Sequence, residues 1–199
     1  GNFDGDDTLD LVTANYGDGT ATVYLGNGDG TFEEAGVYPS GAGAIALASA
    51  DLDGNGAEDL VVANHSAHTV SVLLGNGDGT FTSGPVLPTG NNPRSVALGD
   101  FNGNGRWDLF TASQSGGNLG VRLGNGDGTF GDRTDYPTGS GAHGVALGDL
   151  NEDGLLDGVV VNRNAHTLSL LPGRGDGTFG EAATFESGNS PRSVALGDV

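Results

Sequence analysis

Residues 51–59 read Asp-Leu-Asp-Gly-Asn-Gly-Ala-Glu-Asp, and this nine-residue pattern recurs at one fixed interval along the chain. Related stretches begin at Asn2, Asp100 and Asp149, so that neighbouring copies are 49 residues apart, and a fifth copy begins at Asp198. Residues with side-chain oxygens alternate with other residues, often glycine, in each copy. Such a strict period marks a repeat protein in which each unit carries its own cluster of oxygen ligands.

The sequence between these stretches contains the signals of four short strands in each unit. Residues 95–100 form an apolar run of small residues, residues 59–64 are rich in β-branched residues, and residues 69–74 alternate strictly. Residues 75–81 contain Asn-Gly and Asp-Gly, which are strong hairpin signals, and an irregular fourth strand is expected at 86–88. No stretch has a helical period. We therefore predict an all-β fold of four-stranded antiparallel β-propeller blades in one domain at 1–199, with units of about 2–50, 51–99, 100–148 and 149–197.

The chain resembles the FG-GAP/VCBS-type repeats of integrin α-subunit heads and of many secreted bacterial proteins and lectins. The resemblance rests on Ala-Leu-Gly-Asp-Phe-Asn-Gly-Asn-Gly at 97–105, Leu-Gly-Asn-Gly-Asp-Gly-Thr-Phe at 74–81 and Ser-Val-Ala-Leu-Gly-Asp at 193–198. It covers the whole chain. It implies a calcium-binding β-propeller, but it does not imply one activity.

The nine-residue stretches are candidate calcium loops. Calcium takes about six to eight oxygen ligands, and alternate positions of a tight loop can present five of them. Glycine at the fourth and sixth positions permits turns at positive φ, and Glu152 and Asp7 depart from this pattern. The predicted Ca²⁺ ligands, with backbone carbonyls at Thr8, Ala57, Arg106 and Leu155, are Asn2, Asp4, Asp6, Asp10, Asp51, Asp53, Asn55, Asp59, Asp100, Asn102, Asn104, Asp108, Asp149, Asn151, Asp153, Asp157 and Asp198.

The acidic loops have two other interpretations, an EF-hand and a polar hairpin turn. An EF-hand needs glutamate at the twelfth position, where this chain has Val62, Thr111 or Val160 in strand-like sequence. Polar hairpin turns without a metal remain the alternative. The third loop has only two carboxylates, so we expect it to attract calcium most weakly. The Gly-Asp-Gly turns are expected to be tight hairpin turns, and they are centred on Asp29, Asp78, Asp127 and Asp176.

The composition restricts the partners. The formal net charge is −19, with 26 acidic residues against seven basic ones, which argues against nucleic acid or an anionic membrane as a partner. Neither a membrane-spanning segment nor a cysteine occurs in the sequence. Weak calcium sites fill where calcium is millimolar, so we expect an extracellular or cell-surface location.

The units differ most on one predicted face. Antiparallel strands place the calcium loops and Gly-Asp-Gly turns on one face, and the turns between the second and third strands and the connections between units on the other. The second face is expected to bind a protein or glycan, although surface drift is the alternative. The candidate ligand-binding residues on it are Tyr16, His65, His68, Arg94, Gln114, His143, Arg163, His166 and Arg192. Trp107 is expected to pack between blades or to stack on a sugar.

No catalytic constellation is visible, so the chain is not expected to be an enzyme. We predict a non-catalytic extracellular module for adhesion, scaffolding or lectin-like binding. The alternatives are a structural subunit of a surface layer or fibre and a part of a carbohydrate-active enzyme. Residues 193–198 are expected to form the first strand of a further blade, so that the chain pairs with more blades or with copies of itself in a larger ring or repeat assembly.

Overall fold

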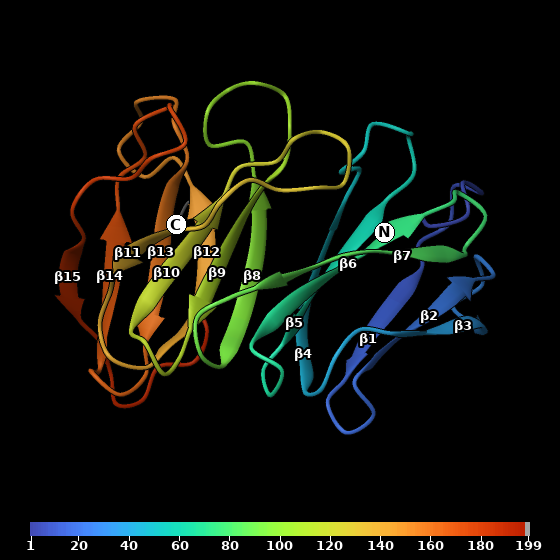
Figure 1. Cartoon of the computed structure of the whole chain (residues 1–199), viewed down its shortest axis with the longest axis horizontal. Coiled ribbons are helices and arrows are strands. Elements are labelled where there is room, and N and C mark those ends of the chain that lie inside the picture. The colour runs from blue at the N-terminus through green and yellow to red at the C-terminus, as the bar shows by residue number, and fades with distance from the viewer. Residues whose placement is uncertain (198–199) are drawn as a thin grey trace.

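The computed structural model describes residues 1–197, and within them it contains strands and no helix. The strands form four antiparallel sheets that follow one another along the chain, from the blue sheet to the red sheet in Figure 1. Each sheet consists of consecutive strands, so neighbours in sequence are neighbours in space. Because residues 1–197 contain no helix, they include no helix long and apolar enough to cross a membrane. The all-β prediction is confirmed.

The strands repeat along the chain, but each four-stranded sheet is offset from the predicted units, because its first strand, at 44–50, 93–99 or 142–148, lies at the end of the preceding unit. The first sheet has three strands, β1 (Leu11–Asn15), β2 (Thr20–Gly26) and β3 (Phe32–Pro39). The second has β4 (Ala44–Ala50), β5 (Asp59–Asn64), β6 (Thr69–Gly75) and β7 (Phe81–Pro88). The third has β8 (Pro93–Gly99), β9 (Asp108–Ser113), β10 (Asn118–Arg122) and β11 (Thr134–Pro137). The fourth has β12 (Ala142–Gly148), β13 (Asp157–Asn162), β14 (Thr167–Leu171) and β15 (Ala183–Glu186).

The sheets stack face to face, which explains why the second strand of a sheet can be apolar throughout. All six residues of β5 are buried. Leu60 and Val62 pack with residues of the first sheet, whereas Val61 and Ala63 pack in a cluster that includes Val96 of the third sheet. Alternate residues of one strand therefore fill two different inter-sheet cores.

The first strands of successive sheets lie next to one another, because β4 contacts β8 and β8 contacts β12. The last strands are the most exposed, and every residue of β15 is exposed. The sheets thus resemble propeller blades, with their first strands innermost and their last strands at the rim.

The prediction of a strand at 193–198 is wrong for its described part, because residues 193–197 carry no strand. The segment nevertheless runs beside β12, where His143 Nδ1 lies 2.9 Å from the Arg192 carbonyl oxygen and a Cβ at Gly148 would approach Leu196. It occupies the place of a further innermost strand. No second strand pairs with it among residues 1–197, and a strand requires such a partner. Asp198 lies outside the described residues.

Candidate functional site

The last aspartate of each acidic loop holds the loop against its own sheet. Asp59 is fully buried, and its two carboxylate oxygens accept hydrogen bonds from the Leu52 and Gly75 N–H groups at 2.8 and 2.7 Å. Leu52 lies at the start of the loop, and Gly75 ends β6. Equivalent pairs of bonds surround Asp10, Asp108 and Asp157. The sequence pattern predicts this residue only as a metal ligand.

The carboxylates of the second loop converge. Ligand atoms of Asp51, Asp53 and Asp59 lie within 4.8 Å of one another, a grouping of three acidic side chains found in no other loop of residues 1–197. Burial raises the pKa of Asp59, and the charges of Asp53 and Asp51 raise it further. A bound cation would offset this repulsion. The donors are all oxygens, the kind that calcium prefers, so the residues present fit a Ca²⁺ ion.

Hydrogen bonds within the loops fix the directions of the remaining predicted ligands. Asp51 accepts from the Gly54 and Gly56 N–H groups at 2.8 and 3.0 Å, and Asn55 accepts from the Ala57 N–H at 2.6 Å. The same pattern recurs in the third and fourth loops, where Asp100 accepts from Gly105 and Asp149 from Gly154. In the first loop, Asn2 accepts from Gly5 and Asp6 from Thr8. Asn102, Asn104, Asn151 and Asp153 accept backbone N–H bonds in their own loops.

The two residues that replace glycine in the acidic loops adopt the positive φ that glycine adopts at the same positions in other loops. Asp7 has φ 70° and Glu152 has φ 62°, compared with 86° for Gly56 and 78° for Gly54 at the same loop positions. The loops therefore keep their shape, but a residue with a Cβ pays a conformational cost there.

The Gly-Asp-Gly turns are tight hairpin turns, as predicted. In the second sheet, the Asp78 carboxylate accepts hydrogen bonds from the Thr80 N–H and hydroxyl, and these bonds lower the pKa of Asp78. Each turn after the first sheet also bonds to the acidic loop of the preceding sheet. The Gly79, Gly128 and Gly177 N–H groups donate to the carbonyl oxygens of Phe3, Leu52 and Phe101 at 2.9, 3.0 and 3.1 Å. The acidic loops thus connect neighbouring sheets as well as strands.

The opposite ends of the sheets carry the predicted ligand-binding residues. The register between the first two strands shifts at the same place in three sheets, between Ala44 and Ala46, Pro93 and Ser95, and Ala142 and Val145. The residues within these irregularities include Ile45, Arg94 and His143, one variable position of the repeat, and Gly144 follows His143 in the fourth sheet. A bulge turns side chains out of the ladder, so it can present them at the end of the sheet.

Six of these residues form a cluster that we call the basic patch: His65, Arg94, Gln114, His143, Arg163 and Arg192. Arg94 Nε donates to Gln114 Oε1 at 2.7 Å. Burial, together with the nearby charge of Arg94, lowers the pKa of both His65 and His143. Arg163 and Arg192 also act on His143. Three of the seven basic residues of a strongly acidic chain therefore gather at one end of the molecule.

The remaining residues predicted to bind a ligand lie outside the basic patch. Tyr16 is 51% exposed at the edge of the basic patch, with its hydroxyl 3.5 Å from His65 Nδ1. His68 and His166 have left-handed φ values, and their Nδ1 atoms accept hydrogen bonds from the Asn92 and Ser190 N–H groups at 3.0 and 2.9 Å. These two histidines hold the connections between units. Trp107 is 43% exposed, so it is not enclosed between sheets.

Stacked antiparallel sheets with an acidic loop in each unit define a β-propeller-like repeat protein. The chain belongs to the FG-GAP-like repeat family, whose profile matches residues 2–62, 51–111 and 100–160. No curated protein matches the chain in sequence.

Several solved structures share the fold. A lectin from Agrocybe aegerita, described as specific for non-reducing terminal N-acetylglucosamine, is 26% identical, with a TM-score of 0.57 over 90% of this chain and 49% of the lectin. A putative 6-phosphogluconolactonase from Bacteroides uniformis is 10% identical, with a TM-score of 0.73 over 94% of this chain and 54% of its own. A periplasmic gluconolactonase from Pseudomonas aeruginosa is 18% identical, with a TM-score of 0.67 over 94% and 53%. The chain spans about half the length of these structures.

Proposed function

We propose that the chain is a non-catalytic, extracellular, calcium-binding module that binds an acidic glycan through the basic patch. The observation that carries this proposal is the gathering of Arg94, Arg163 and Arg192 with two histidines at one end of a chain whose net charge is −19. Arginine recognises carboxylate and sulfate groups through its fork of donors. The Nε atom of Arg163 is buried and lacks a hydrogen-bond partner within residues 1–197.

Calcium has a supporting role in this proposal. The acidic loops lie at the opposite ends of the strands from the basic patch, and the first three are bonded to the next sheet. Bound Ca²⁺ would neutralise the carboxylates and hold the sheets at fixed angles, and the innermost strands would then keep the arginines in register. The predicted ligands of the four loops are the residues that would hold it. The extracellular location follows from the calcium concentration that such sites need.

The open faces of the end sheets support pairing with further blades or with copies of the chain. Phe101, at the second position of its loop, is covered by the next sheet and is 4% exposed, whereas Leu150 at the same position of the fourth loop is 44% exposed. Leu11 on the first strand of the first sheet is 48% exposed. Such apolar faces would be buried in a larger β-propeller or a longer array.

The lectin similarity favours glycan binding over a purely structural role in a surface layer or fibre. The two lactonases are less than 25% identical to the chain, so their similarity concerns the fold alone. A carbohydrate-active enzyme is therefore only the second candidate function.

A glycan array tests the proposal at pH 7.5 with and without calcium, using uronate-containing, sulfated and neutral oligosaccharides. We expect binding to acidic glycans that Arg94→Ala abolishes and Arg106→Ala leaves unchanged. Arg106 lies in the third acidic loop, so the control removes the same charge from the opposite end of the strands. Binding to neutral glycans or to acidic proteins alone would overturn the ligand class. Turnover of a bound glycan would favour the enzyme alternative.

A further inference from the structure

A hollow of about 510 Å³ lies at the rim of the molecule, between the third and fourth sheets. Its walls include Tyr136 and Pro137 of β11, Leu171 of β14, and Phe179 and Ala182 near β15. A volume of this size suits a small molecule or one side chain of a partner. It is distinct from the basic patch, because its lining includes none of the six patch residues.

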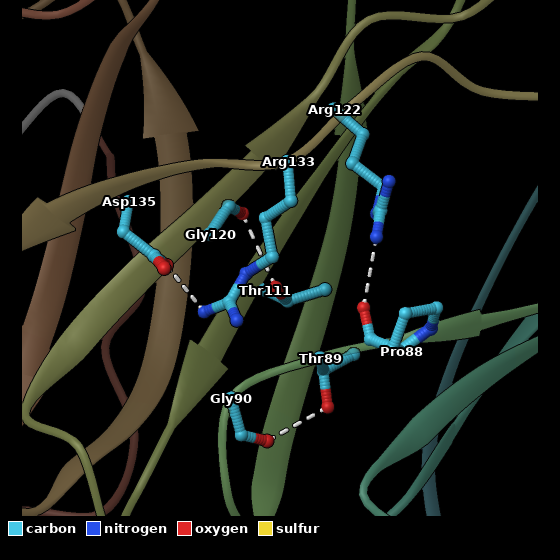
Figure 2. Close-up of polar contacts among 8 residues, drawn as sticks. All are labelled: Pro88, Thr89, Gly90, Thr111, Gly120, Arg122, Arg133 and Asp135. Carbon is cyan, nitrogen blue, oxygen red and sulfur yellow. Dashed lines mark hydrogen bonds and ion pairs between the residues drawn. The ribbon is translucent and has the colours of Figure 1, made fainter.

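The equivalent place one repeat earlier, between the second and third sheets, is filled by the chain itself. Residues 49 positions before Leu171 and Ala182 are Arg122 and Arg133. Figure 2 shows both side chains extending from the third sheet towards the segment Pro88–Gly90 of the second sheet. The two inter-sheet spaces thus have the same origin in the repeat, and one contains arginine side chains where the other is open.

Arg133 shows how two sheets enclose an arginine side chain, although its Nε atom is buried without a hydrogen-bond partner within residues 1–197. Its side chain is only 15% exposed, and its guanidinium group forms an ion pair with Asp135. Gly120 leaves room for it, because a Cβ at Gly120 would collide with Arg133 Nε. A Cβ at Gly90, on the other wall, would lie 3.0 Å from Nη2. The guanidinium group is therefore enclosed by two sheets.

Arg122 shows which backbone groups can bind a second guanidinium group. Its Nη2 atom donates to the Pro88 carbonyl oxygen at 3.0 Å (Figure 2). Its Nη1 atom donates to the Gly131 carbonyl oxygen at 2.6 Å. The counterparts of these two residues are Gly180 and Pro137, and both line the open hollow. Leu171 replaces the arginine that would use them.

We propose that the hollow between the third and fourth sheets binds an arginine side chain presented by a partner protein. Leu171, Phe179 and Tyr136 offer apolar and aromatic surface for the stem and the planar guanidinium group. The Pro137 and Gly180 carbonyls provide acceptors, and Glu181 provides a negative charge on the wall. Arg174 also lines the hollow and would repel a second cation, and Glu181 would offset that repulsion. The overall charge of −19 favours a cationic partner.

Titration with N-acetyl-arginine methylamide, followed by NMR shifts and calorimetry, tests the proposal. We expect one site with a Kd of about 1 mM or tighter. Ala182→Arg should abolish binding, because it recreates the arrangement of Arg133. The control Ala35→Arg adds the same side chain at the equivalent, exposed position of the first sheet and should leave binding unchanged.

Two further variants make the test independent of Ala182→Arg. Arg133→Ala should open the second hollow and raise the stoichiometry from one site to two. Thr184→Asp restores the carboxylate that Asp135 provides in the other space, and it should tighten binding by about two- to fivefold. The proposal is overturned if the wild-type protein shows no shifts at millimolar ligand. It is equally overturned if Ala182→Arg retains the site, or if neutral monosaccharides bind there and displace the arginine derivative.

Discussion

Replacement of Asp59 by alanine separates the structural role of the last loop aspartate from its role as a metal ligand. Asp59→Ala leaves two buried N–H groups, those of Leu52 and Gly75, without their acceptor. Each orphaned group costs about 1–3 kcal/mol, so the gross loss is about 2–6 kcal/mol. Removal of a carboxylate whose pKa is raised by burial offsets a part of this. We expect a net loss of about 2–4 kcal/mol, a large fraction of the stability of a domain.

Urea unfolding followed by circular dichroism, with excess calcium and with chelator, measures this loss. Asp59→Ala should be destabilised under both conditions. The matched control is Asp53→Ala, because Asp53 is half-buried and its carboxylate accepts from the Asn55 N–H and Nδ2 groups. Asp53→Ala should lose less than about 1 kcal/mol in chelator. In calcium at about 100 times the Kd it should lose about 2.7 kcal/mol more, the linkage term of a lost site. Wild-type stability of Asp59→Ala in chelator would refute the reasoning.

Three other perturbations have expected outcomes. Glu152→Gly should raise stability by about 1 kcal/mol, because glycine adopts positive φ without strain, and a lower urea midpoint would contradict this. The pKa values of His65 and His143 lie below 6.5 in the folded protein. As the pH falls, these histidines are therefore protonated in the unfolded chain at a higher pH than in the folded protein. Stability should therefore fall as the pH drops from about 6.5 through these lowered values, and an acidic glycan should reduce the fall; a pH-independent urea midpoint between 7.5 and 5.5 would exclude the effect. Asn102→Asp should tighten calcium binding at the third loop, measured by calorimetry, and an unchanged titration would show that charge does not limit that site.

The hairpin signals are local, and the repeat period places them in every unit, so together they predict most of the fold. The β-branched run at Asp59–Asn64 is β5 as expected, and the Asn-Gly and Asp-Gly turns form where they were predicted. The absence of a strand at 193–197 was not predictable from the segment itself. Its sequence matches the innermost strands, but a strand also needs a neighbour to pair with, which is not a property of its own residues.

The functional sites were predictable only in part. The pattern identified the loop residues and the variable face, but not the two hydrogen bonds of Asp59, because its partners lie seven and sixteen residues away. The arginine-filled space did leave a signal. The third unit has Gly120 where the other units have Ser or Thr, and in the same unit Arg133 replaces Ala or Gly. The two changes become related only when the sheet places both side-chain positions together.

Calorimetric titration of Ca²⁺ into chelator-stripped protein, paired with thermal melting in calcium and in chelator, tests the central claim most directly. The arrangement of the acidic loops predicts saturable binding, tightest at the second loop where three carboxylates converge, and a melting temperature that rises with calcium. Absence of binding heat together with an unchanged melting temperature would show that the acidic loops are polar turns and not calcium sites.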